Sequence, residues 1–323
     1  MKEPLIEVKD LQIYFKQKSS RLFSLKSDHL KAVDNVNLTI QKGETFGLVG
    51  ESGSGKSSIG KAILRYYNPT AGEIYYKRTE IGHMKEAQLL PYRKKMQSIF
   101  QDPYSSLDPS RTIREIICEP MEIHKLYTSA ERKERAAQLI EIVGLKKNDL
   151  LKYPHEFSGG QRQRISIARA LSVQPEFIVC DEPISSLDVS LQAQIIHILE
   201  DLQEKYGLTY LFISHQLQVV QKICDRIGVL YLGNILETAP SETLYKNPIH
   251  PYTQLLMSSI LFPDPRIKTL DQIVIDSGVQ KRVASGCKFQ NRCPYCMEKC
   301  RSEVPALKEV APEHWVACHR YTN

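Results

Sequence analysis

The sequence has no long apolar run and no large excess of charge, and each absence excludes a class of protein. No apolar run approaches the roughly 20 residues of a membrane-spanning helix, and Met1-Lys2-Glu3-Pro4 lacks the apolar core of a signal peptide. The net charge of +6 is mild for 323 residues, and Arg93-Lys94-Lys95 is typical of a solvated face rather than of a nucleic-acid footprint. We therefore expect a globular cytoplasmic protein that binds no nucleic acid and meets a membrane only as a peripheral partner.

One glycine-rich motif stands out in what is present. Residues 50–57 fit the phosphate-loop pattern G-x-x-x-x-G-K-[ST], between an apolar run that predicts a buried strand and a helical pattern. The dinucleotide pattern G-x-G-x-x-G fails because Ser58 stands at its third glycine. A chance glycine-rich turn is the alternative, and both flanks argue against it.

The motif predicts a nucleoside triphosphate site. Lys56 would reach the β- and γ-phosphates, and the Ser57 hydroxyl would ligate Mg²⁺. Backbone N–H groups and the start of the following helix would attract the phosphates. The residues expected at the nucleotide are Gly50, Glu51, Ser52, Gly53, Ser54, Gly55, Lys56, Ser57 and Ser58.

Two carboxylates follow a second apolar run. Phe177-Ile178-Val179-Cys180 predicts a buried strand that ends at Asp181-Glu182. Because ligands of open parallel sheets bind beyond the carboxyl ends of the strands, Asp181 would hold Mg²⁺ through water and Glu182 would polarise an attacking water. The alternative is an acid pair that caps a helix. The phosphate loop favours the catalytic interpretation, since it calls for a Mg²⁺ carboxylate.

Candidate residues lie at three predicted strand ends, and each has a purely structural interpretation as its alternative. Gln101 would offer an amide oxygen to Mg²⁺, or simply lie on the surface. His215 would share the sheet edge of Glu182, or be structural. Tyr14 or Phe15 would stack on a nucleobase, or pack in the core.

A second candidate phosphate contact begins a later helix. Ser158-Gly159-Gly160-Gln161 combines a hydroxyl, close backbone approach and a helix N-terminus. A helix cap without a ligand has the same pattern. Strands alternate with helices elsewhere, which predicts an α/β fold with a parallel sheet, and residues 103–172 interrupt it as a mainly helical insert.

Together and in this order, these segments resemble an ATP-binding-cassette (ABC) protein over residues 5 to about 260. Phe157 stands where that family most often has leucine, a position of apolar packing. The matching elements are Walker A at Gly50–Ser57, the Q-loop at Gln101, the signature at Ser158–Gln161, Walker B at Phe177–Glu182, the D-loop at Ser186-Leu187-Asp188, the switch histidine at His215 and the base-stacking aromatic at Phe15.

The resemblance implies the fold and the chemistry of that family. The fold would be a P-loop cassette with a parallel or mixed sheet core, an antiparallel β subdomain and a helical subdomain at about 103–172. The implied catalytic residues are Glu182, His215, Gln101 and Lys56, and the implied Mg²⁺ ligands are Ser57, Gln101 and Asp181. Two cassettes would face each other head to tail, and the nucleotide bound to the partner would be contacted by Ser158, Gly159, Gly160, Gln161 and Asp188.

Three segments are similar to a narrower group, the ATPase subunits of bacterial oligopeptide, dipeptide and nickel importers. They are the loop 16–31, Phe100–Pro109 and Asn247–Thr253. The resemblance implies the second of two unequal cassettes, bound at the cytoplasmic face of the cell membrane to a non-identical ATPase subunit and two permease subunits. A membrane partner would dock just after Gln101, and an extracellular solute-binding protein would be an indirect partner.

The cargo implied is an oligopeptide or dipeptide, with nickel or a metallophore as the alternative. A soluble, non-transport ABC ATPase is the rival class. Such proteins usually carry a long coiled-coil insert or two cassettes in tandem, whereas this chain has a short insert and no second phosphate loop.

Five of the eight cysteines cluster near the end, with the spacing Cys287-x5-Cys293-x2-Cys296-x3-Cys300-x17-Cys318. In a reducing compartment this pattern indicates a metal, and thiolates suit Zn²⁺ or an iron–sulfur cluster. The resemblance implies that Cys287, Cys293, Cys300 and Cys318 ligate a [4Fe–4S] cluster, with Zn²⁺ as the rival. Because Cys296 is extra, the choice of four ligands stays open. We expect a nucleotide-binding domain at 1–260 and a metal-binding, regulatory extension at 261–323.

Overall fold

The computed structural model describes residues 3–16, 29–185, 187–258, 283 and 285–321. Most of the expected loop at 16–31 and the expected boundary at 260/261 lie outside these residues. The chain divides into two compact units. The first comprises Met1–Glu3, Gln41–Glu44 and Met84–Ile213, and the second comprises Pro4–Ile40, Thr45–His83 and Ser214–Asn323.

Parallel strands form the centre of the first unit. β7 (Phe177–Asp181) pairs with β8 (Thr209–Ile213) on one side and with β6 (Met96–Ile99) on the other. Every residue of β7 and β8 is buried, as expected for parallel strands covered on both faces. The helices α2 (Glu86–Lys95) and α7 (Val189–Tyr206) precede β6 and β8, so strands and helices alternate as the sequence predicts.

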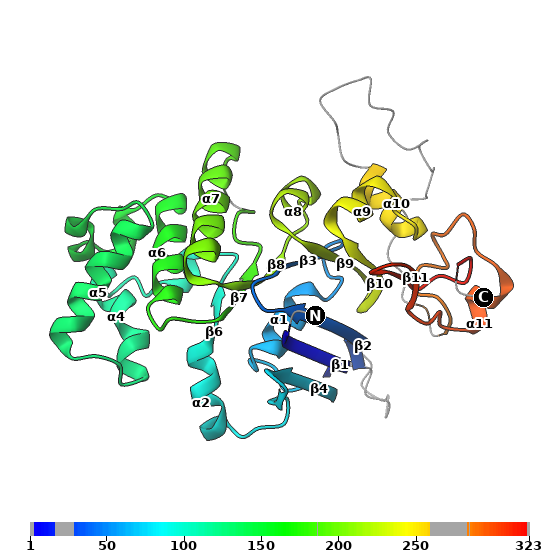
Figure 1. Ribbon diagram of the computed structural model, residues 1–323, viewed down its shortest axis with the longest axis horizontal. Helices are drawn as coiled ribbons and strands as arrows, with labels where there is room; N and C mark the ends of the chain where they lie inside the picture. Colours follow the sequence, from blue (N-terminus) through cyan, green and yellow to red (C-terminus); the bar gives the residue numbers. More distant parts are fainter. Residues whose placement is uncertain (1–2, 17–28, 186, 259–282, 284, 322–323) are drawn as a thin grey trace, which may run out of the picture. The chain divides into compact units, whose positions relative to one another are not determined.

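The described secondary structure between Pro103 and Leu171 is helical (Figure 1). Thr112 and Thr128 begin two of these helices with capping boxes. The apolar stripe of the longest one is buried, including Ala136 and Ile140. The helices are α3 (Pro103–Ser106), α4 (Ile113–Ile123), α5 (Ser129–Ile142) and α6 (Gly159–Leu171), with 3-10 turns at Lys147–Leu151 and Pro154–Glu156.

The second unit contains a four-stranded sheet in the order β2-β1-β4-β5. β4 is antiparallel to both β1 and β5, and the inward residues of β1, such as Ile6 and Val8, are buried as their alternation requires. The strands are β1 (Pro4–Lys16), β2 (His29–Gln41), β4 (Ala71–Tyr76) and β5 (Thr79–Glu80).

A second set of strands in this unit is mixed in direction. β3 (Thr45–Val49) is parallel to β9 (Arg226–Tyr231), and β10 (Asn234–Pro240) is antiparallel to β9. β12 (His314–Val316) is antiparallel to β10 and to β11 (Lys308–Ala311), so the described C-terminal residues extend these strands (Figure 1). The helices are α1 (Lys56–Ile63), α8 (Leu217–Ile223), α9 (Ser241–Lys246), α10 (Pro251–Ser258) and α11 (Glu298–Ser302).

The predicted α/β class is therefore confirmed, with a mixed rather than purely parallel arrangement of strands. In the part of the chain that the structure describes, no helix has both the length and the apolar character that a membrane crossing requires.

Candidate functional site

The glycine-rich loop joins β3 to α1, the context that the motif requires. Lys56 opens α1 and is only 5% exposed. Its Nζ donates to the carbonyl oxygens of Gly50 at 2.8 Å and Glu51 at 3.0 Å, so the ammonium lies inside the curl of the loop and at the start of a helix. Both features attract an anion. The buried Ser54 hydroxyl has no hydrogen-bond partner among the described residues, a condition that a bound ligand would relieve.

Two glycines of the loop are required by its path. The φ angle is +149° at Gly50 and +108° at Gly55, in the region that other residues avoid. A Cβ on Gly50 would lie 2.1 Å from the Leu230 carbonyl oxygen, and one on Gly55 would lie 2.3 Å from that of Ala32. No larger residue fits either position without moving the backbone.

Glu51 is held from the C-terminal part of the same unit. The Nη1 and Nη2 atoms of Arg292 donate to its two carboxylate oxygens at 2.9 and 3.0 Å. The backbone N–H of Glu51 donates to the Tyr252 hydroxyl at 2.9 Å. Sequence reasoning missed both contacts, because 241 and 201 residues separate Arg292 and Tyr252 from Glu51; Tyr252 lies in the family-like segment Asn247–Thr253, but nothing there points to the loop.

His215 and Phe15 belong to the same unit as the loop. The N–H of Ser214 donates to the Leu48 carbonyl at 3.3 Å, so the exposed His215 follows a residue bonded to β3 just before the loop begins. The Phe15 ring is half-buried and meets Tyr67 edge-on at 5.2 Å. The Tyr14 hydroxyl donates to Asp34 Oδ1 at 2.6 Å.

The first unit brings Gln101 and Glu182 together. Asp181 ends β7 and is largely buried. Glu182 follows with φ +47°, and its N–H donates to the Ile213 carbonyl at 2.9 Å. Gln101 Nε2 donates to Glu182 Oε2 at 3.1 Å. A carboxylate with an amide partner at a strand end is suited to orient a water molecule.

The segment expected as the signature is a helix cap in this chain. Gln161 N–H donates to the Ser158 hydroxyl at 3.4 Å, and Ser158 N–H donates to Gln161 Oε1 at 3.0 Å. The cap is therefore present, and Ser158 itself remains exposed. Gly160 is packed tightly, since a Cβ there would lie 3.0 Å from Leu191 Cδ1. Phe157 is buried, as its apolar role predicts.

Asp188 of the expected D-loop begins α7. Its Oδ1 accepts hydrogen bonds from Ser190 Oγ at 2.6 Å and from Leu191 N–H at 2.9 Å. The bond from Ser190, followed by that from the Leu191 N–H, lowers the pKa of Asp188. The carboxylate is thus fixed in its charged form at the start of the helix. Ser186, also expected in the D-loop, lies outside the described residues.

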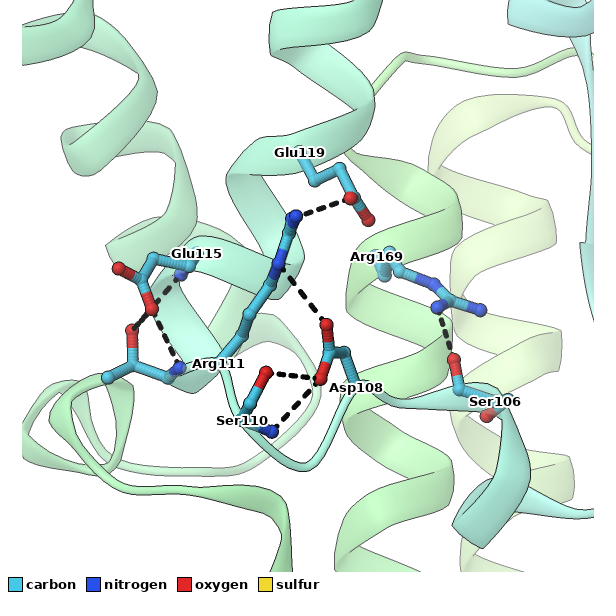
Figure 2. A network of polar contacts seen from close by, with 8 residues as sticks. Ser106, Asp108, Ser110, Arg111, Glu115, Glu119 and Arg169 are labelled. Carbon is cyan, nitrogen blue, oxygen red and sulfur yellow. Dashed lines mark hydrogen bonds and ion pairs between the residues drawn. The ribbon is translucent and has the colours of Figure 1, made fainter.

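The segment that follows Gln101 is fixed by polar contacts (Figure 2). Arg169 of α6 donates to the Ser106 carbonyl at 2.5 Å. Arg111 pairs with Asp108 at 3.4 Å and with Glu119 at 2.6 Å. The turn between α3 and α4 is therefore tied to both α4 and α6, and it keeps a definite shape.

The cysteines near the C-terminus are free thiols. Burial raises the pKa of Cys287 to about 12 and that of Cys293 to about 11, and neighbouring cysteines, including Cys300 and Cys318, add to both. The thiols of Cys287, Cys293, Cys300 and Cys318, together with Cys296, are therefore neighbours in the fold. Nevertheless, no group of three or more His, Cys, Asp or Glu side chains in the described ranges is arranged to hold a metal ion. The geometry does not support the predicted iron–sulfur cluster or its zinc alternative.

Two family models match the chain. The one described as "ABC transporter" matches residues 33–185. The one described as "Oligopeptide/dipeptide transporter, C-terminal region" matches residues 236–300. The first match includes the glycine-rich loop and Walker B, and the second includes Tyr252 and Arg292.

Curated relatives match nearly the whole length. The putative oligopeptide transport ATP-binding protein YkfD of Bacillus subtilis (strain 168) is 50% identical over 324 residues, which cover 99% of this chain and 96% of the relative. The oligopeptide transport ATP-binding protein AppF of the same strain is 48% identical over 324 residues, covering 99% and 98%. A putative peptide import ATP-binding protein of Brucella ovis is 49% identical over 318 residues, covering 98% of each.

Solved structures agree with the expected fold. The ATP-binding cassette MJ0796, in a dimeric post-hydrolysis state bound to ADP and Pi, superposes with a TM-score of 0.66 at 28% identity, over 73% of this chain and 98% of that one. CbiO1 of Clostridium perfringens, part of the complex cbiONQ, gives a TM-score of 0.65 over 76% and 92%. At 22% identity, this second likeness concerns the fold alone. The predicted cassette fold is confirmed.

Proposed function

This chain belongs to the ABC transporter family as an ATP-hydrolysing subunit, and on that premise we propose that it energises the import of oligopeptides or dipeptides into a bacterial cell. The observation that carries the proposal is the near-complete match, at 50% identity, to a relative whose name is that of an oligopeptide transport ATP-binding protein. The match of residues 236–300 to the oligopeptide/dipeptide transporter C-terminal region supports it independently.

The triphosphate binds at the loop of the second unit. Lys56 lies between the carbonyls of Gly50 and Glu51, from which it turns to the β- and γ-phosphates. The backbone from Gly50 to Ser58 surrounds the phosphates, and Phe15 stacks on the base. Both the curled loop and the helix start favour an anion there.

Hydrolysis uses side chains that lie just after the ends of strands. Glu182 takes a proton from the attacking water, Gln101 keeps the carboxylate oriented through its 3.1 Å hydrogen bond, and His215 orients the γ-phosphate. The Ser57 hydroxyl, the Gln101 amide oxygen and Asp181 would hold Mg²⁺, which prefers hard oxygen ligands. When bound, this ion neutralises charge on the β- and γ-phosphates.

A second, non-identical cassette completes each nucleotide site. The start of α6, with Ser158, Gly159, Gly160 and Gln161, contacts the triphosphate held by that partner, and Asp188 lies in the same interface. ATP closes the two cassettes, and its hydrolysis lets them part, a conformational gate driven by a ligand at an interface.

The membrane part of the transporter consists of two permease subunits, and this chain binds them at the cytoplasmic face of the membrane. The turn tied by Arg169 and Arg111 (Figure 2), just after Gln101, receives one of them. An extracellular solute-binding protein delivers the peptide, so it is a partner of the permeases and only indirectly of this chain.

The [4Fe–4S] cluster at Cys287, Cys293, Cys300 and Cys318 also stands as a proposal, with Zn²⁺ as its rival. Its support is the donor set of the sequence, since four thiols between Cys287 and Cys318 suit either metal, with Cys296 as a fifth candidate. No step of the ATP cycle passes through it. After anaerobic purification, iron and sulfide with broad visible absorbance would support the cluster, stoichiometric zinc would support the rival, and neither metal would refute both.

Uptake by cells that lack this chain tests the cargo and the transport class together. We expect loss of labelled tripeptide uptake, unchanged uptake of radioactive nickel, and restoration of peptide uptake by the chain supplied in trans. Pull-down from detergent-treated membranes should recover a different cassette and two permeases. Loss of nickel uptake alone would favour the metal-importer alternative. Normal uptake of both solutes without any membrane partner would favour a soluble ABC ATPase.

A further inference from the structure

The segment Cys287–Cys293 contacts the phosphate loop and strand β2. Arg292 forms its bidentate pair with Glu51 inside the loop. Lys288 Nζ lies 3.5 Å from Asp34 Oδ2, and Asp34 accepts the hydroxyl of Tyr14, the neighbour of Phe15. Side chains of one short segment therefore contact the loop directly and, through Asp34 of β2, the neighbour of the proposed base-stacking ring.

The segment is anchored by a buried aromatic residue. Phe289 is fully buried and meets Tyr231 and Tyr252 with both ring centroids at 5.3 Å. Tyr252 accepts the N–H of Glu51 at 2.9 Å. The Arg292 side chain is 12% exposed and also lies over the Tyr231 and Phe289 rings. The pair is held in place by packing, unlike a solvated surface ion pair.

The charge of Glu51 explains why such a contact matters. The phosphate loop carries the Glu51 carboxylate, whose negative charge would repel a bound triphosphate. The Arg292 guanidinium neutralises that carboxylate with two parallel hydrogen bonds, a geometry that fixes its direction as well as its charge. Without Arg292, the Glu51 carboxylate would lose its bidentate cationic partner within the phosphate loop.

We propose that Arg292 is a positioning residue for ATP binding: it neutralises and restrains Glu51, so that the C-terminal region forms part of the construction of the phosphate loop. This inference rests on the proposed binding of triphosphate at Gly50–Ser57. It assigns the C-terminal region a direct effect on nucleotide affinity. The Tyr252 hydroxyl also restrains Glu51, because it accepts the hydrogen bond of the Glu51 backbone N–H.

The test measures the dissociation constant of MgATP for the full purified chain. Arg292→Gln should weaken binding about tenfold, between the effects typical of exposed and of buried ion pairs, and Arg292→Lys should fall in between because it keeps the charge but loses the fork. Lys299→Gln is the matched control. Lys299 also directly precedes a cysteine, but it pairs with Glu303 at 3.9 Å, away from the loop, and its substitution should leave affinity within about twofold.

A double-mutant cycle separates charge neutralisation from general support of the fold. In a Glu51→Gln background the carboxylate is gone, so Arg292→Gln should weaken ATP binding by no more than about twofold further. Equal binding by Arg292→Gln and Lys299→Gln would overturn the inference, as would a tenfold loss that persists in the Glu51→Gln background. Should Arg292→Gln not fold, normal affinity of Arg292→Lys would overturn it. The Lys56→Ala chain tests the underlying proposal separately, because ATP binding by that variant would disprove the site itself.

Discussion

Glu182 combines a strained backbone with an oriented carboxylate. Its φ of +47° costs a non-glycine residue roughly 1–3 kcal/mol, and the bond from Gln101 Nε2 fixes one carboxylate oxygen. The N–H bond to the Ile213 carbonyl holds this conformation at the end of β7. Strain of this kind persists where the surrounding structure imposes it, and its position beside Asp181 suits a catalytic base.

Replacing Glu182 by Gln tests the role of the base. The amide keeps the size of the side chain but accepts no proton, so ATP should still bind while phosphate release falls by about 10²- to 10⁴-fold. Glu200→Gln, which changes an acid on α7, is the control and should hydrolyse ATP normally. Both rates are measured with the partner cassette present. Equal turnover by the two variants would refute the assignment of the base.

At the scale of the elements, the start of α6 has a structural role and a proposed binding role. The hydrogen bonds between Ser158 and Gln161 form the cap, and the exposed hydroxyl is proposed to contact ATP on the partner. A substitution that keeps the cap but reverses the electrostatics separates the two roles.

Ser158→Asp is such a substitution, because aspartate caps helices as well as serine does. We predict urea unfolding close to that of the unaltered chain, but no ATP-dependent association with the second cassette in size-exclusion chromatography, since the new charge repels the triphosphate. Ser158→Ala should lose about 1 kcal/mol of stability instead. Normal association by the Asp variant would leave Ser158 with its capping role alone.

Local sequence patterns predicted the elements well but not the limits of their buried faces. In the sequence of α7 the helical period places Leu191, Ile195, Ile198, Leu199 and Leu202 on one face, whereas the structure buries Ile195, Ile196, Leu199 and Leu202. A helical period places an apolar stripe, but its width depends on what packs against it. Motif order predicted where Gln101, Glu182 and Lys56 lie, but not the bond of Gln101 to Glu182 or those of Lys56 to its own loop.

The pairing of Glu51 with Arg292 was beyond the reach of sequence reasoning. The two residues are 241 positions apart, and each type is by itself typical of a solvated surface. The predicted metal site shows the converse: a sequence pattern is present, but the spacing of cysteines does not determine how their sulfur atoms are arranged.

At the scale of the whole chain, a buried polar centre fastens the described C-terminal strands. Glu237 is fully buried and accepts hydrogen bonds from Ile249 N–H at 2.8 Å, His250 N–H at 2.9 Å and His314 Nε2 at 2.7 Å. A buried carboxylate is tolerated only when it is satisfied in this way. His314 therefore has a structural role in this centre.

His250, beside this centre, makes stability depend on pH. Burial lowers the pKa of His250 to about 4, against the opposing charge of Glu237, while the unfolded chain keeps a value near 6.5. Between these values the unfolded state binds more protons, so stability is complete above about pH 6.5 and falls as the pH drops towards 4, by up to about 3 kcal/mol.

His250→Asn removes this titration but keeps an acceptor for the Tyr252 N–H, which now donates to Nδ1 at 3.0 Å. Urea unfolding at pH 7 and pH 4.5 should show a smaller acid-induced loss for the variant than for the unaltered chain. An equal loss would place the acid sensitivity elsewhere.

The central claim is that triphosphate bound at Lys56 drives peptide import. The most direct measurement is uptake of a labelled tripeptide by cells whose only copy of the chain carries Lys56→Ala, with Lys205→Ala on α7 as the control. We predict that Lys56→Ala reduces uptake to the level of cells without the chain, and that Lys205→Ala leaves it normal. Normal uptake by the Lys56→Ala cells would contradict the account.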